Sequence, residues 1–146
     1  MRTFSILLLL FSLVSTARAQ SSPEPETILK KMQLANQYFM DKWPDPGKTI
    51  ITNRERPSNI WTRAVYYEGL MGLYSINPDT AYYRYAADWA EFHQWGFRSG
   101  NQTRNADDYC CAQTYIDLYT IDPKPERIAN VFACMDHLLS LPESDA

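Results

Sequence analysis

Two adjacent carboxylates, Asp107 and Asp108, stand in the stretch of the chain that is richest in possible chemistry. They follow Asn105, where the pattern predicts the start of a helix that runs to Tyr119. Acids in a first helical turn offset the helix dipole, and the spacing from Asn105 to Asp108 is that of a capping box. Capping therefore explains Asp108 by structure alone. It does not explain Asp107, which is left open to a role in binding or catalysis.

Basic side chains near the ends of the predicted helices are candidate partners for an anionic ligand; they are Arg63, His93, Arg98 and Arg104. An Arg can hold a ligand carboxylate through two parallel hydrogen bonds. The alternative is a solvated surface charge that contributes little. We retain Arg63 and His93 as candidate substrate-binding residues, although His93 stands at the far end of its predicted helix.

Hydrophobic periodicity and Pro-containing turns predict five helices. They cover residues 26–42, 59–74, 80–94, 105–119 and 125–140. Ser58 or Asn59 can cap the second helix, and Asp79 can cap the third. Residues 46–58, between the first and second helices, contain two prolines and a glycine and are predicted to be a loop.

The sequence Leu-Tyr-Ser-Ile-Asn-Pro at residues 73–78 recurs 45 residues later as Leu-Tyr-Thr-Ile-Asp-Pro at 118–123. Each copy ends one helix, turns at a proline and begins another, and a chance match of two turns is the alternative. Repeats of this size predict stacked helix hairpins, in an open solenoid or in a closed (α/α) ring. In a ring, the helices at 59–74 and 105–119 would be the inner ones.

One repeat before Asp107 is residue 62, the neighbour of Trp61, so Trp61 and Asp107 are expected at the same rim of the array. An indole face there could stack on a sugar ring. A core Trp at the start of a helix is the equally weighted alternative.

Residues 1–19 have a basic start at Arg2, an apolar run, and the small residues Ala17 and Ala19 around Arg18. This pattern predicts a secretory signal peptide, and hence a protein exported to the periplasm or beyond whose domain spans residues 20–146. Cleavage would move the formal charge from −3 to −5, which disfavours a nucleic-acid partner. No later segment is long and apolar enough to predict a membrane span.

Three cysteines remain in that domain, Cys110, Cys111 and Cys134. An odd number does not make a disulfide framework, and adjacent cysteines have the wrong spacing for zinc. They are predicted to be small buried residues, with a bridge between Cys134 and one of the other two left open.

Three stretches resemble glycoside hydrolase families 105 and 88, the unsaturated rhamnogalacturonyl and glucuronyl hydrolases, with family 105 the closer. WTRAVYYEGLMGLY at residues 61–74 is similar to their first inner helix, and YAADWAEFHQWG at 85–96 to the next outer helix. NADDYCCAQTYIDLY at 105–119 is similar to the second inner helix and is the most specific of the three.

The resemblance implies an (α/α)6 toroid that removes a terminal 4,5-unsaturated uronic acid from lyase-generated oligosaccharides in polysaccharide degradation. In these families one Asp is thought to protonate the vinyl ether double bond and help water add, while another on the preceding inner helix orients the sugar. Asp107 matches the latter and is the candidate catalytic residue, with Trp61, Asp108, Arg63 and His93 as candidate substrate contacts. No metal or organic cofactor is expected.

A further 45 residues after Asp107 is position 152, beyond Ala146. We therefore expect the chain to be an N-terminal part of an incomplete toroid that lacks the proton donor and is inactive alone. The principal alternative is a non-catalytic helical-repeat module that binds a glycan or a protein. A weaker one is another toroid enzyme, such as a sugar epimerase or a lyase.

Overall fold

The computed structural model describes residues 22–142, and helices account for most of this part of the chain. The helices are α1 (Pro25–Lys42), α2 (Trp61–Ile76), α3 (Thr80–Phe92), α4 (Ala106–Ile121) and α5 (Pro125–Ser140). The predicted all-α fold of helix hairpins is confirmed. The predicted signal peptide, residues 1–19, lies outside the described residues.

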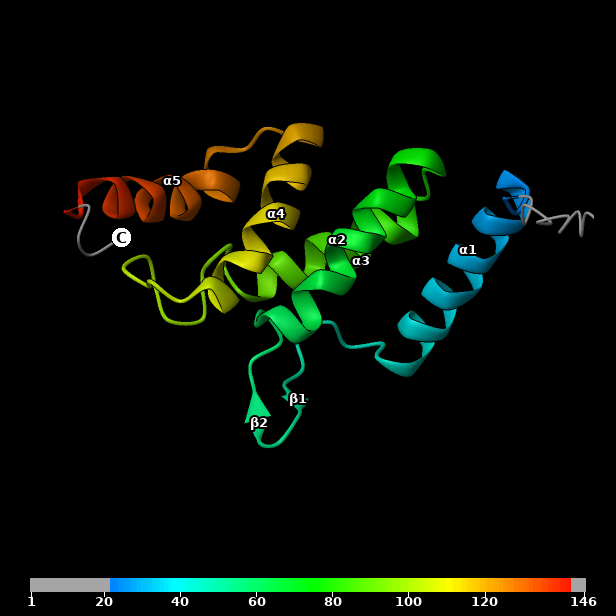
Figure 1. The fold of residues 1–146 in the computed structure, drawn as a ribbon, viewed down its shortest axis with the longest axis horizontal. Coiled ribbons are helices and arrows are strands. Elements are labelled where there is room, and N and C mark those ends of the chain that lie inside the picture. The colour runs from blue at the N-terminus through cyan, green and yellow to red at the C-terminus, as the bar shows by residue number, and fades with distance from the viewer. Residues whose placement is uncertain (1–21, 143–146) are drawn as a thin grey trace, which may run out of the picture.

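The two repeats fold into two equivalent hairpins, α2–α3 and α4–α5, that pack through α2 and α4 (Figure 1). Their turns close in the same way. The Asn77 N–H donates to the Leu73 carbonyl at 2.9 Å, and 45 residues later the Asp122 N–H donates to the Leu118 carbonyl at 3.0 Å. The repeated sequence therefore encodes a repeated helix ending.

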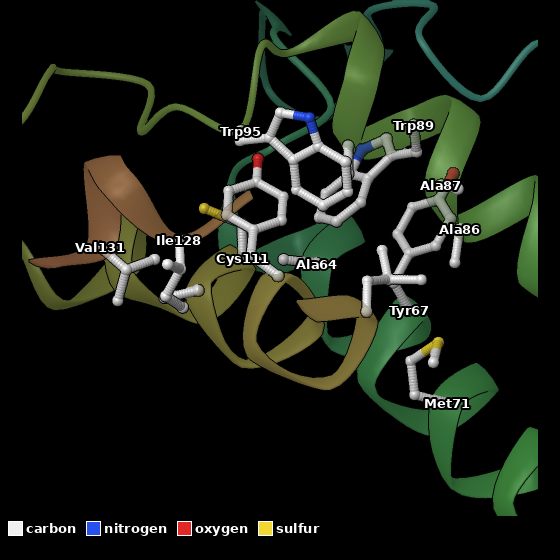
Figure 2. Packing of buried hydrophobic residues seen from close by; sticks show 14 of the residues in the cluster. Ala64, Tyr67, Met71, Ala86, Ala87, Trp89, Trp95, Cys111, Ile128 and Val131 are labelled. Carbon is white, nitrogen blue, oxygen red and sulfur yellow. The ribbon is translucent and has the colours of Figure 1, made fainter. Parts of the chain in front are cut away.

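Aromatic rings and small residues fill the core between these helices (Figure 2). Tyr67 on α2 stacks on Trp89 on α3, with ring centroids 4.0 Å apart and planes 13° from parallel. Ala64, Ala86 and Ala90 are fully buried, and their small side chains let the helix backbones approach the large rings. Burial of these rings supplies much of the driving force for folding.

The start of α2 differs from the prediction. Ile60 is the N-cap residue and no side chain caps the helix. The Ser58 hydroxyl donates to the Pro46 carbonyl, and the Asn59 amide donates to the Gly96 carbonyl. The predicted caps at Ser58 and Asn59 are therefore wrong, because both side chains tie distant loops to this end of the array. At α3 the predicted cap is confirmed, since the Asp79 carboxylate accepts from the Ala81 N–H at 2.8 Å.

The connection between α1 and α2 is more ordered than a loop. It contains an antiparallel hairpin of β1 (Ile50–Ile51) and β2 (Glu55–Arg56), which projects from the end where α1 stops and α2 begins (Figure 1). At its base, Gly47 lies so close to Phe92 that a Cβ there would be 2.3 Å from the ring. A side chain at this position would therefore require the Phe92 ring to move.

Candidate functional site

The first turns of α2 and α4 lie at the same end of the array, because the two helices run parallel and in register. The side-chain amide of Gln113 on α4 has its nitrogen toward α2. This nitrogen donates to Glu68 Oε1 at 2.7 Å. Two turns further along, Ser75 and Thr120 line one groove between the same helices. Both pairs are 45 residues apart, so the sequence repeat is also the packing register.

Trp61 is the first residue of α2, and its side chain remains 45% exposed. Ile60 before it is buried and fixes the chain where the helix begins. At the 45-residue offset, the residue of α2 level with Asp107 is Thr62, the neighbour of Trp61. The structure thus brings Trp61 and Asp107 into the first turns of neighbouring parallel helices at one end of the array.

Asp107 is half-buried in the first turn of α4. Its backbone N–H donates to Asn105 Oδ1 at 3.0 Å, which fixes the turn. Within residues 22–142 its carboxylate has no hydrogen-bond or ion-pair partner. A carboxylate at a helix N-terminus is stabilised by the helix dipole. Asp107 is therefore a positioned acceptor that is open to a ligand.

Asp108 has a different environment, since it is fully buried. Arg98 Nε lies 2.7 Å from its Oδ1, and the Thr103 hydroxyl donates to its Oδ2 at 2.7 Å. The Arg98 contact counts as an ion pair but not as an aligned hydrogen bond, so Oδ1 has charge compensation without a directed donor. The Asn105 N–H, which a capping box would direct to Asp108, donates instead to Thr103 Oγ1 at 3.2 Å. The predicted capping box is therefore wrong, and Asp108 instead ties the loop before α4 to its first turn.

Residues 31–145 match the sequence model of Glycosyl Hydrolase Family 88, and the matched range contains every candidate site residue. The chain belongs to glycosyl hydrolase family 88. Membership indicates a glycosidase that acts on a carbohydrate. Neither the curated proteins nor the solved structures contain a match to this chain.

Arg63 of this family 88 chain is on α2 and only 6% exposed. Its guanidinium carbon lies 4.9 Å from the centroid of the Phe39 ring and 4.5 Å from that of Trp43. Arg63 therefore belongs to the contact between α2 and the end of α1. The structure does not show it paired with Asp107 or Asp108.

His93 closes the C-terminal end of α3 against the segment before α2. Its Nε2 lies 2.7 Å from Ser58 Oγ, and burial lowers the pKa of the ring to about 4. The imidazole is therefore neutral at neutral pH. The Ser58 hydroxyl donates its proton to the Pro46 carbonyl, so Ser58 Oγ can only accept from His93. The His93 tautomer that fits carries its proton on Nε2 and donates it to Ser58 Oγ. In this position His93 connects the end of α3 to the segment before α2 through Ser58.

A left-handed turn that the sequence did not predict follows α3 and directs the chain back toward α4. Gln94 and Trp95 have φ values of 53° and 56°, which are unfavourable for residues with side chains. The Asn130 side chain donates to both of their carbonyls, at 3.2 and 3.1 Å. Tyr115 and Asn59 donate to the next carbonyl, that of Gly96. The turn is thus held by α4, by α5 and by the segment before α2, and it brings Arg98 to Asp108.

The three cysteines are all free thiols, so the bridge left open for Cys134 is not formed. Burial raises the pKa of Cys111 to about 12, and it also raises those of Cys110 and Cys134. The thiol form of a cysteine is a poor nucleophile. Cys111 and Cys134 are fully buried and serve as core residues, as predicted, whereas Cys110 is only half-buried, which differs from the prediction.

Neither a metal site nor a membrane span is found in the described part of the chain. Residues 22–142 contain no group of three His, Cys, Asp or Glu side chains that could hold a metal ion. None of the helices there combines the length and the apolar character that crossing a bilayer requires.

Proposed function

We propose that this family 88 glycosidase removes 4,5-unsaturated uronic acid from oligosaccharides that a polysaccharide lyase has produced. Water adds across the vinyl ether double bond, with a proton going to C4 and the hydroxyl to C5. The resulting hemiketal opens, and the glycosidic bond at C1 then breaks so that the rest of the oligosaccharide leaves as an alcohol. The observation that carries the proposal is the pairing of an exposed indole with an unpartnered carboxylate, Trp61 and Asp107, at one end of two parallel helices. The resemblance of residues 61–74 and 105–119 to two inner helices of a toroid supports it.

In this proposal Asp107 orients the sugar. An ionised carboxylate only accepts hydrogen bonds, and sugar hydroxyls are ready donors. The Asn105 cap fixes the backbone of Asp107, so the carboxylate position is set before the ligand arrives. Such preorganisation reduces the entropy that binding must overcome.

Trp61 supplies the apolar part of the contact. A sugar ring presents C–H groups on its faces, and an indole offers a flat surface of matching size. The 45% exposure of Trp61 leaves this surface accessible.

Asp108 acts as a positioning residue and does not touch the sugar. It is fully buried, and its two oxygens face Arg98 and Thr103. Exposing it to a ligand would leave Arg98 without its ion pair. Export remains part of the proposal on the strength of residues 1–19 alone.

The proposal is tested by calorimetric titration with an unsaturated uronyl disaccharide prepared by lyase digestion. We expect Asp107→Asn and Trp61→Ala each to weaken binding by about tenfold, since each removes a ligand contact worth roughly 1–2 kcal/mol. Asp88→Asn, which alters an exposed carboxylate on α3, is the matched control and should leave binding unchanged. Binding that neither Asp107→Asn nor Trp61→Ala weakens would contradict the proposal.

A further inference from the structure

A cleft of about 540 Å³ lies where the end of α1, the following loop with β1, and the first turn of α2 meet. Its volume is within the range of small-molecule sites. Three of its lining residues are cations, Lys42, Lys48 and Arg63, and one is an acid, Asp45. The chain as a whole has a formal charge of −3, so this positive cleft is a local departure from an acidic protein.

Arg63 is the inner wall of the cleft and has no anionic partner. It is only 6% exposed, and among residues 22–142 no carboxylate pairs with it and no hydrogen bond satisfies its N–H groups. No Arg63 nitrogen is among the fully buried side-chain atoms that lack a hydrogen-bond partner, so its N–H groups face the solvent. Its guanidinium packs on Phe39 and Trp43, and stacking on aromatic faces leaves the in-plane N–H groups available. This is the arrangement that binds a carboxylate through two parallel hydrogen bonds.

The two lysines stand at the mouth of the same cleft. Both are exposed, and Lys42 Nζ lies 4.8 Å from the centroid of the Trp43 ring. The acid in the lining, Asp45, accepts a hydrogen bond from the Gly47 N–H through Oδ1 at 3.1 Å, and the three cations outnumber it. Trp43 therefore provides an aromatic wall between a buried cation and an exposed one, which suits a ligand with both a ring and a negative charge.

This cleft is separate from the surface of Trp61. Arg63 follows Trp61 by two residues, so the two side chains leave α2 about 200° apart around its axis. A single sugar ring does not fill both places. Successive sugars of one oligosaccharide are a natural ligand for two neighbouring sites at the same end of the array.

We propose that the Arg63 cleft binds the carboxylate of a second, saturated uronic acid in the oligosaccharide. The ligand class rests on the proposed function, and the cleft itself rests on the unpartnered Arg63 and the charges around it. The substrate would then be an acidic oligosaccharide with at least two uronic acids.

The test is an NMR titration of the protein, with the indole ¹⁵N–H signals as reporters and glucuronic acid as the probe. Glucose has the same ring without the carboxylate and is the ligand control. We expect glucuronic acid to shift the Trp43 signal and glucose not to shift it. Arg63→Gln should weaken glucuronic acid binding by at least tenfold, and Lys48→Gln by about threefold.

Lys48→Gln keeps the test decisive if Arg63→Gln does not fold, since Lys48 is exposed. Lys30→Gln, an exposed lysine near the other end of α1, is the protein control and should change binding by less than twofold. The proposal is overturned if glucuronic acid leaves the Trp43 signal in place, or if Lys48→Gln and Lys30→Gln have equal effects. Tighter binding of glucose 6-sulfate than of glucuronic acid would overturn the carboxylate assignment in favour of a sulfate ester.

Glucuronic acid contains no C4=C5 double bond, so its binding at Trp43 does not depend on the proposed reaction. Asp107→Asn should leave that binding unchanged. If glucuronic acid binds at Trp43 but the unsaturated disaccharide does not bind at Trp61, the proposed function is refuted and the binding role of the Arg63 cleft stands. Binding of the unsaturated disaccharide at Trp61, without binding of glucuronic acid at Trp43, would refute the proposed role of the Arg63 cleft and leave the proposed function in place.

Discussion

Replacing Arg98 by Met tests whether Asp108 is held for structure rather than for a ligand. The substitution keeps most of the side-chain length and removes the charge that lies 2.7 Å from Asp108 Oδ1. Asp108 is fully buried, so its carboxylate is left with the Thr103 hydroxyl alone. Breaking a buried ion pair from one side costs about 3–5 kcal/mol. Because the Arg98 side chain is 20% exposed, water can partly replace it, and we expect a loss of about 2–4 kcal/mol.

The free energy of unfolding is measured by urea denaturation at pH 7. Arg104→Met is the matched control, because Arg104 lies in the same loop and is exposed; we expect a change within about 0.5 kcal/mol. Combining Arg98→Met with Asp108→Asn removes both charges, and the double-mutant cycle should give a coupling energy of at least about 1 kcal/mol. A loss below about 1 kcal/mol for Arg98→Met, or two substitutions that simply add, would refute the structural role of Asp108.

Two further predictions concern the contacts that fasten the loops at this end of the array. Burial lowers the pKa of His93 from 6.5 to about 4, so between these pH values the unfolded chain binds a proton that the folded chain does not. The contribution of His93 to stability should therefore be fully present above pH 6.5 and should fall by about 1–2 kcal/mol toward pH 4, because the ring is only partly buried. Unfolding curves at several pH values between 4 and 7 should show this slope, and His93→Gln should reduce it. Gly47→Ala should lower the free energy of unfolding by about 1–3 kcal/mol because the new Cβ overlaps the Phe92 ring, and Phe92→Ala in the same chain should recover part of the loss. An equal cost of Gly47→Ala in both backgrounds would rule out that explanation.

The helices and their register could be predicted from the sequence because each rests on local signals. The helix at 125–140 was predicted with the bounds that α5 has, since Pro125 begins it and the apolar period continues to its end. The 45-residue repeat predicted that α2 and α4 begin at the same end, because a repeated turn gives a repeated hairpin. Asp79 and Asn105 cap α3 and α4 as their side chains allow.

The environment of each acid could not be read from the sequence, because it depends on residues brought from other segments. Asp107 and Asp108 are neighbours of the same type, yet one is open and the other fully buried. Arg98 and Thr103 decide this difference, and they reach Asp108 only because the left-handed turn after α3 reverses the chain. The only local signal for that turn is Gly96, which directly follows the two residues with positive φ values, Gln94 and Trp95.

The predicted caps of α2 failed for a similar reason. Ser58 and Asn59 have the right side chains for capping, but His93, Pro46 and Gly96 offer them partners across the fold. The hairpin of β1 and β2 was missed because each strand has only two residues, too few for a period to be seen.

The shared sugar surface of Trp61 and Asp107 is tested most directly by the four indole signals of the protein during titration with the unsaturated uronyl disaccharide. Our account predicts that the Trp61 indole signal and the Asp107 backbone amide shift together with one dissociation constant. The buried Trp89 and Trp95 signals should stay in place. A Trp61 signal that does not move while the disaccharide binds elsewhere on the chain would contradict the account.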